Sequence, residues 1–325
     1  MADVGAANAT GDGRLPPIRP PRNKLETRGV RLRKITIIGV GLLGGSIGLA
    51  VKRRKLVPPG GVAGFVRRTA SLKDCEKAGA VDFATTDLLA AVWDADLVVL
   101  CTPLAQMRSR VREMLPALKR GATVTDVGSV KASVVRELES LVAGAGGHFV
   151  GSHPMAGAEK TGVGAAVADL FVNAICVVTP TQKSKPAAVR QVEQFWQGLG
   201  ARTLRLAPEQ HDLLVSRSSH LPHVLAATLA GYVLKPAHPK SQAALCANGF
   251  RDTTRIASGS PEMWRDIALA NRKNLAKALA DFIVDLHRFQ KWLARADGNA
   301  VTKFFETAKA RRDRWRANSV SPSPE

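Results

Sequence analysis

The sequence contains few cysteines, few aromatic side chains and few acidic residues. Four of its 325 residues are cysteine, and they lie far apart without a C-x-x-C pair. This spacing indicates neither a disulfide framework nor a structural zinc cluster, and we expect no metal site. Such cysteine usage is typical of a reducing compartment, so we predict a cytoplasmic protein.

A hydrophobic run long enough to cross a membrane is also missing. The longest candidate is the uncharged segment at residues 35–51, which has the sequence ITIIGVGLLGGSIGLAV. A membrane span needs about 20 apolar residues. The five glycines of this segment would also weaken a continuous helix. Its β-branched first half and its Gly/Leu second half instead favour a strand, a turn and the start of a helix.

The scarcity of acids gives the chain a formal net charge of +20, from 47 lysines and arginines against 27 aspartates and glutamates. This charge is compatible with a nucleic acid, an anionic membrane surface or a small anionic substrate. No block of five or six like charges marks a nucleic-acid-binding arm. We therefore expect the charge to serve solubility or to attract small anions, and we predict neither a nucleic-acid nor a membrane partner.

Strand and helix patterns alternate over the first two thirds of the chain. We predict strands at 35–38, 62–66, 95–101, 122–126, 148–153, 174–179 and 201–206, and helices at 70–78, 105–118, 129–143 and 187–198. Alternation of this kind indicates βαβ units and a parallel sheet. The predicted fold class is α/β, a Rossmann-type doubly wound parallel sheet followed by an all-α dimerisation domain.

The strand patterns end near residue 206, and we place a domain boundary there. The predicted regions are a disordered basic leader at 1–33, a dinucleotide-binding domain at 34–206, a helical substrate-binding and dimerisation domain at 207–316 and a disordered tail at 317–325. The helical domain contains apolar residues at heptad spacing: Leu275, Leu279, Phe282, Leu286, Phe289 and Leu293. This seam predicts a homodimer, although a helix packed within its own domain would show the same pattern over so few heptads.

A glycine motif follows the first predicted strand and opens a helix. Gly39 permits a tight turn, Gly41 allows the backbone to approach a pyrophosphate, and Gly44 allows close packing of helix and strand. The helix N-terminus, with Leu42 and Leu43 in its first turn, faces the anion. In this context the motif predicts a dinucleotide site.

The choice between NAD and NADP is indicated at the end of the second strand. An acidic residue there would bind the ribose hydroxyl of NAD, but Val66 occupies the position and Arg67 and Arg68 follow it. Two arginines could hold the 2′-phosphate of NADP, or they could be merely solvated. We predict NAD or NADP, with NADP favoured, and assign Thr102 and Pro103, which follow a later strand, to the same site.

Three polar clusters are candidates for the remaining chemistry. His153 follows a strand in a loop of small residues and is the predicted general base. Ser129, at the end of another strand, suits either a substrate contact or a helix N-cap. His220 and His223 lie one helical turn apart, but no nearby carboxylate or thiolate completes a metal site.

The third cluster continues with two arginines. Arg251 and Arg255 are four residues apart, so on one helix they would share a face suited to clamping carboxylates.

Together these clusters resemble the prephenate and arogenate dehydrogenase family of tyrosine biosynthesis. The resemblance covers residues 34–293 and rests on GVGLLGGSIG, DVGSVK, GSHPMAGAEKTG, SHLPH and GFRDTTRIASGSPEMWRDI, in that order. It implies a small-molecule substrate and the oxidative decarboxylation of prephenate to 4-hydroxyphenylpyruvate with hydride transfer to NAD(P). It further implies that His153 accepts the hydroxyl proton, that Ser129 hydrogen-bonds the same region and that Arg255 binds a carboxylate. Four more residues would line or gate the pocket: Glu159, His220, His223 and Arg251.

Alternatives remain at the level of the sequence. Arogenate, which would give tyrosine directly, differs from prephenate by an amino group in place of a keto group. Another two-domain dehydrogenase of small hydroxy acids would share the nucleotide-binding domain. A basic nucleic-acid-binding protein with a nucleotide-sensing domain is the alternative outside the enzymes.

Overall fold

We describe a computed structural model, which covers residues 17–20, 32–157, 160–238 and 240–320. The described residues pack as two compact units, one ending at Asn271 and the other beginning at Arg272. Most of the predicted leader lies outside the described residues. Within its described part, Arg19 pairs with Thr203 in an isolated antiparallel bridge.

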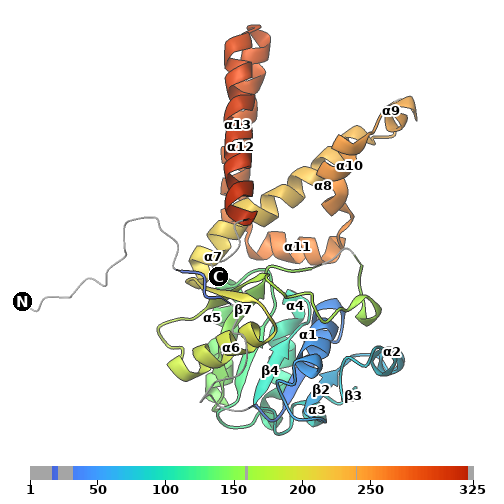
Figure 1. The fold of residues 1–325 in the computed structure, drawn as a ribbon, viewed down its shortest axis with the longest axis vertical. Coiled ribbons are helices and arrows are strands. Elements are labelled where there is room, and N and C mark those ends of the chain that lie inside the picture. Colours follow the sequence, from blue (N-terminus) through green and yellow to red (C-terminus); the bar gives the residue numbers. More distant parts are fainter. Residues whose placement is uncertain (1–16, 21–31, 158–159, 239, 321–325) are drawn as a thin grey trace, which may run out of the picture. The chain divides into compact units, whose positions relative to one another are not determined.

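The first unit is built on a six-stranded parallel sheet (Figure 1). Its strands, in chain order, are β1 (Ile35–Ile38), β2 (Val62–Phe65), β3 (Phe83–Thr85), β4 (Leu97–Leu100), β5 (Thr123–Asp126) and β6 (His148–Phe149). Their spatial order is β3-β2-β1-β4-β5-β6, so the chain changes direction across the sheet between β1 and β4. This order confirms the predicted doubly wound fold and places the topological switch point between those two strands.

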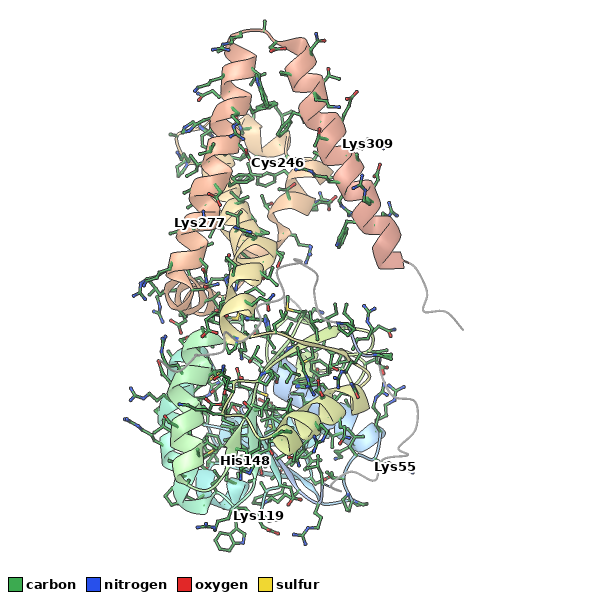
Figure 2. The ribbon with its side chains drawn as sticks, turned by 90° about the vertical axis from the view of Figure 1, so that its left-hand side faces the viewer. Lys55, Lys119, His148, Cys246, Lys277 and Lys309 are labelled. Atoms are coloured by element: carbon green, nitrogen blue, oxygen red, sulfur yellow. The ribbon has the colours of Figure 1, made fainter. Side chains whose placement is uncertain are left out.

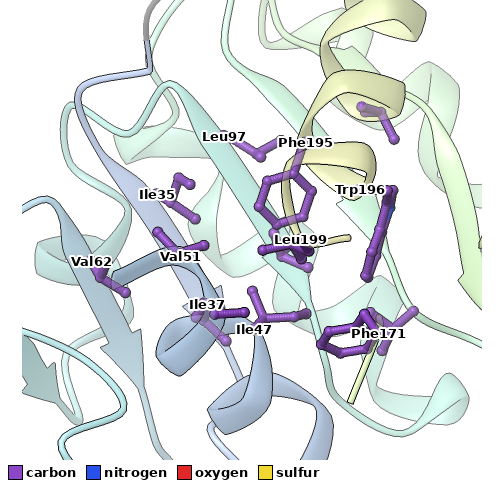
Figure 3. Close-up of a cluster of buried hydrophobic side chains, with 14 of the residues drawn as sticks. Ile35, Ile37, Ile47, Val51, Val62, Leu97, Phe171, Phe195, Trp196 and Leu199 are labelled. Atoms are coloured by element: carbon purple, nitrogen blue, oxygen red, sulfur yellow. The ribbon is translucent and has the colours of Figure 1, made fainter. Parts of the chain in front are cut away.

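Helices cover both faces of this sheet, because its strands are apolar on both sides. The helices are α1 (Leu42–Arg53), α2 (Ala70–Ala78), α3 (Leu88–Val92), α4 (Leu104–Met114), α5 (Ala132–Gly144) and α6 (Pro186–Gly198), with short 3₁₀ turns at Leu115–Ala117 and Val163–Ala165. In β1, Ile35 and Ile37 join the core under α1 and α6, whereas Ile38 joins the core under α3, α4 and α5. Figure 3 shows the first of these cores, in which Trp196 of α6 is fully buried.

The predicted strand at 148–153 was wrong as a single element. β6 ends at Phe149, and β7 (Gly151–Pro154) belongs to a second sheet with β8 (Ile175–Thr179) and β9 (Arg202–Arg205). A Cβ atom at Gly151 would lie 2.6 Å from Thr179 Oγ1 and 2.9 Å from Val135 Cγ2, so a glycine is needed where the chain changes sheets. As a result, His153 lies in the second sheet. β7 is antiparallel to β8, and β8 is parallel to β9.

Beyond β9 the described part of the first unit is helical. The elements are α7 (Pro208–Val215), the π-helical turn η3 (Ser216–His220), α8 (Leu221–Val233), α9 (Lys240–Ala244), α10 (Asn248–Thr254), the 3₁₀ turn η4 (Arg255–Ser258) and α11 (Pro261–Ala270). α8 packs against both α10 and η4. This segment brings the predicted histidine and arginine clusters close in space.

The second unit consists of α12 (Arg272–Ala294) and α13 (Gly298–Val320), which pack against each other. The Phe289 ring of the predicted seam lies 4.9 Å from that of Phe304, centroid to centroid. Leu286 and Leu293 of the same seam are more than half exposed in the single chain. Lys277 of α12 and Lys309 of α13 are also exposed (Figure 2). In the part of the chain that the structure describes, no helix is long and apolar enough to cross a membrane.

Candidate active site

The glycine motif forms the turn between the C-terminal end of β1 and α1, at the edge of the sheet where its parallel strands end. Gly39 has φ +99°, and a Cβ atom there would lie 2.9 Å from the carbonyl oxygen of Cys101. A Cβ atom at Gly44 would overlap the backbone of Gly39, whereas none of the described atoms lies within 4 Å of one at Gly41. α1 begins directly after Gly41, with Leu42 and Leu43 half-buried in its first turn. The edge therefore has the close packing and the free space that a bound pyrophosphate requires.

The other predicted cofactor residues lie at the same edge of the sheet. Thr102 and Pro103 follow β4, the neighbour of β1, and Pro103 is the N-cap of α4. Thr102 Oγ1 is buried and has no hydrogen-bond partner among the described residues, so a ligand could satisfy it. Arg67 and Arg68 follow β2 and are exposed, whereas Val66 is buried. These residues fit a dinucleotide bound across the switch point.

A chain of hydrogen bonds connects His153 to a second histidine and a carboxylate. His153 lies in β7 and is 8% exposed, with Nδ1 2.8 Å from Nε2 of His211. The opposite nitrogen of His211, Nδ1, is 2.8 Å from Oδ1 of Asp212. His211 and Asp212 both belong to α7 and are buried. The structure thus places a buried His-Asp pair directly behind the predicted base.

Asp212 also caps α5. The backbone N–H groups of Lys131 and Ala132 donate to its carboxylate at 2.7 Å and 2.9 Å, which satisfies donors that a helix N-terminus leaves unpaired. The N-cap position is Lys131, so the alternative role of Ser129 as N-cap is wrong. Ser129 instead lies half-buried in the loop between β5 and α5, and its backbone is close to His220.

A buried ion pair connects the two sheets next to the hydrogen bonds between His153, His211 and Asp212. Lys131 and Asp126 are both fully buried and contact each other directly. The Lys131 ammonium also donates to the carbonyl oxygen of Ser152 at 2.8 Å, and Asp126 accepts from the backbone N–H groups of Gly128 and Ser152. Because Ser152 precedes His153, the pair holds β7 beside the end of β5.

Burial keeps the histidines of the site neutral. The pKa of His153 is well below its usual 6.5, first because of burial and then because of the positive charges that His211, Lys131 and His220 would carry. Burial also lowers the pKa of His211, and Asp212 partly opposes this effect. Burial lowers the pKa of His220 to about 4. At pH 7, His153 is therefore an uncharged imidazole that can accept a proton.

His220 and His223 are held by groups that the sequence did not reveal. Asn271 Nδ2 donates to the carbonyl oxygen of Asp212 at 2.8 Å and lies 3.2 Å from Nδ1 of His220. The His223 ring stacks on Trp264 with a centroid distance of 3.4 Å. Nε2 of His220 and Nε1 of Trp264 are buried without a hydrogen-bond partner among the described residues. No group of three His, Cys, Asp or Glu side chains within the described ranges could hold a metal ion.

The predicted substrate arginines do not share one helix. Arg251 lies in α10, but α10 ends at Thr254 and Arg255 begins the 3₁₀ turn η4. Both side chains are exposed, and their segments pack against α8, which carries His223. Glu159 lies outside the described residues.

Sequence reasoning missed His211, Asp212 and Asn271. The only sequence signal for His211 and Asp212 was that they are adjacent at the start of the helical region. Nothing in their position along the chain related them to His153. Asn271 is the C-cap that follows α11 and gives no pattern at all. Their importance follows from contacts between elements more than 50 residues apart.

Two family models together match most of the chain, from residue 47 to residue 307. The nucleotide-binding domain of prephenate dehydrogenase matches residues 47–205, and the dimerization domain of prephenate dehydrogenase matches residues 207–307. The chain belongs to the prephenate dehydrogenase family. It is therefore an NAD(P)-dependent oxidoreductase, and the match to a dimerization domain agrees with the predicted homodimer through the helical region.

Individual relatives lead to the same family. The chain is 35% identical to the prephenate dehydrogenase of Bacillus subtilis over 284 residues, which cover 86% of this chain and 75% of that one. It is also 35% identical to the cyclohexadienyl dehydrogenase of Zymomonas mobilis over 285 residues, which cover 86% of this chain and 95% of that one.

Solved structures share the fold over most of their length. Prephenate dehydrogenase from A. aeolicus, in complex with hydroxyphenyl propionate and NAD⁺, superposes with a TM-score of 0.81 at 30% identity, covering 88% of this chain and 99% of that one. Synechocystis arogenate dehydrogenase superposes with a TM-score of 0.73 at 29% identity, covering 87% of this chain and 99% of that one.

Proposed function

We propose that the protein catalyses the NAD(P)-dependent oxidative decarboxylation of prephenate to 4-hydroxyphenylpyruvate in tyrosine biosynthesis. The observation that carries the proposal is a buried, neutral His153 at the end of β7, in a chain whose glycine-rich edge fits a dinucleotide. A neutral imidazole can accept the hydroxyl proton that an alcohol releases when it is oxidised.

The reaction removes a hydride and carbon dioxide from the substrate, while the hydroxyl proton leaves its oxygen during oxidation and returns to it after decarboxylation. His153 accepts the proton of the ring hydroxyl, and Ser129 hydrogen-bonds the same group. The carbon that carries the hydroxyl loses a hydride, for which the nicotinamide ring, when bound, would be the acceptor. The bond to the ring carboxylate then breaks as carbon dioxide leaves, and its electron pair makes the ring aromatic and leaves a phenolate oxygen. His153 returns the proton to this oxygen, which gives the hydroxyl group of the product.

The remaining pocket residues recognise the carboxylates. Arg255 binds one carboxylate, since a guanidinium forms charge-assisted hydrogen bonds with it. Four further residues line or gate the pocket: Arg251, His220, His223 and Glu159, of which Glu159 lies outside the described residues. Nε2 of His220 has no hydrogen-bond partner among the described residues, which supports this role because a bound substrate would satisfy it.

Two further assignments complete the proposal. We place the boundary between the nucleotide-binding and helical domains at residue 206, between the end of β9 at Arg205 and the start of α7 at Pro208, so that the compact unit ending at Asn271 contains the start of the helical domain. The protein is cytoplasmic, which is supported by four cysteines that are all free thiols.

The proposed activity can be tested with the purified protein and four combinations of substrate and cofactor. We expect prephenate with NADP to give the fastest increase in absorbance of the reduced nucleotide. Arogenate as the better substrate would instead assign the reaction that yields tyrosine directly, a choice that the names of the relatives leave open. Absence of turnover in all four combinations would contradict the proposed function.

The cofactor preference can be tested at the exposed arginines after β2. Replacing Arg67 and Arg68 together by alanine should lower kcat/KM for NADP by about 10- to 100-fold, the size of a lost charge-assisted contact, and change that for NAD by less than about threefold. The matched control is Lys183→Ala with Lys185→Ala, which removes two exposed charges near the start of β6, at the opposite end of the sheet. Equal losses for both cofactors would contradict a phosphate-binding role.

A further inference from the structure

We propose that the His211-Asp212 pair positions His153 by selecting the ring nitrogen that acts as the base. The pair would fix the tautomer of His153 in the resting enzyme and stabilise its protonated form during turnover. The inference rests on the proposed role of His153 as the base, and it assigns positioning residues that do not touch the reacting atoms.

The direction of each hydrogen bond follows from Asp212. Its carboxylate already accepts from two backbone N–H groups of α5, so it is a fixed acceptor. His211 must therefore carry its proton on Nδ1, which faces Asp212 at 2.8 Å. In a neutral His211 the other nitrogen, Nε2, is then an acceptor, and His153 Nδ1 lies 2.8 Å from it.

The same logic fixes the tautomer of His153. Its Nδ1 must donate to His211, so its proton is on Nδ1 and its Nε2 has a free lone pair. Nε2 is the nitrogen that can take a proton from a substrate hydroxyl. With the opposite tautomer, Nε2 would already hold a proton and His153 could not act as the base there.

The hydrogen bond also becomes stronger when His153 is charged. After Nε2 accepts the substrate proton, the imidazolium donates from Nδ1 to His211, and a bond from a charged donor is worth more than one from a neutral donor. Both rings are almost fully buried, so little solvent competes for this bond. The pair therefore stabilises the state that exists after proton transfer, without a contact to the substrate.

Two substitutions of His211 separate this role from a loss of packing. In His211→Gln, the amide nitrogen can donate to Asp212 while the amide oxygen accepts from His153 Nδ1, which reproduces both bonds. In His211→Asn, the shorter side chain can reach Asp212 but not His153. We expect His211→Asn to lower kcat by about 10- to 100-fold, the factor that corresponds to one hydrogen bond to a charged group. KM for the substrate should stay within about twofold.

His211→Gln tests whether a side chain that keeps both hydrogen bonds also keeps the activity. We expect His211→Gln to retain kcat within about fivefold of the wild-type value, because the acceptor for Nδ1 is kept. Circular dichroism and thermal unfolding would show that both variants are folded. A wild-type kcat in His211→Asn, or an equal loss in two folded variants, would overturn the proposal.

Nuclear magnetic resonance of ¹⁵N-labelled histidine provides a readout that needs no turnover. The chain has seven histidines, so the ring signals can be assigned from single substitutions. We expect His153 and His211 both to carry the proton on Nδ1 at pH 7 in the wild-type protein, and His153 to lose this preference in His211→Asn. A His153 proton on Nε2 would overturn the proposal even in an active enzyme. Lack of activity with the expected tautomers would instead count against the proposed function alone.

Discussion

Replacing His153 by asparagine is expected to lower kcat by about two to four orders of magnitude, the usual contribution of a general base. Asparagine keeps a polar group in β7 but cannot accept the hydroxyl proton. Binding of the cofactor, measured by fluorescence titration, should be unchanged because the glycine motif and Thr102 are untouched. Steady-state kinetics with the substrate at saturation would measure the loss.

The pH profile gives an independent check on the same residue. The pKa of His153 is lowered below 6.5, so the base is already unprotonated at pH 7, and kcat/KM should fall only when the pH drops below that lowered pKa. This acidic limb should be missing in His153→Asn. The matched control is His148→Asn, in β6, outside the proposed site. A near wild-type kcat in His153→Asn would show that another group is the base.

Replacing Lys131 by methionine is expected to lower the free energy of unfolding by about 3–5 kcal/mol, as when one partner of a buried ion pair is removed. The substitution leaves the carboxylate of Asp126 fully buried without its counter-charge. Urea unfolding followed by circular dichroism would measure the change. The double variant Lys131→Met with Asp126→Asn should recover most of the loss, because no uncompensated charge remains.

A surface lysine provides the control for this stability prediction. Lys119 contacts Asp96 at 2.6 Å and Asp94 at 3.0 Å, and it lies at the surface of the first unit (Figure 2). Lys119→Met should cost less than about 1 kcal/mol, since solvent reaches this partly exposed pair and screens it. A loss in Lys131→Met as small as that in Lys119→Met would contradict a structural role of the buried pair.

The backbone geometry of the glycine motif was predictable from the sequence. The glycine motif is confined to six adjacent residues. φ +99° requires a glycine at position 39 and close packing requires one at position 44, whereas Gly41 leaves free space for a ligand. The βαβ alternation added the context that made the motif specific. Because these constraints are local, they leave a pattern in neighbouring residues.

Elements without a local pattern were missed or misjudged. β3 and α3 are only 3 and 5 residues long, too short to show a clear period. The strand predicted at 148–153 was continuous in β propensity, but it changes sheets after Phe149 because of the space around Gly151. The helix predicted to begin at Ser129 begins at Ala132, where a carboxylate from another helix caps it.

By itself, the sequence determined the doubly wound fold, the dinucleotide edge and the candidate base, because each depends on residues close together in the chain. Only the tertiary structure decided what surrounds that base. His211 and Asp212 lie more than 50 residues after His153, and they meet it because α7 packs against β8, the strand paired with β7. Burial at that contact removes water and so lowers the pKa of His153, while the carboxylate of Asp212 sets the direction of the hydrogen bonds.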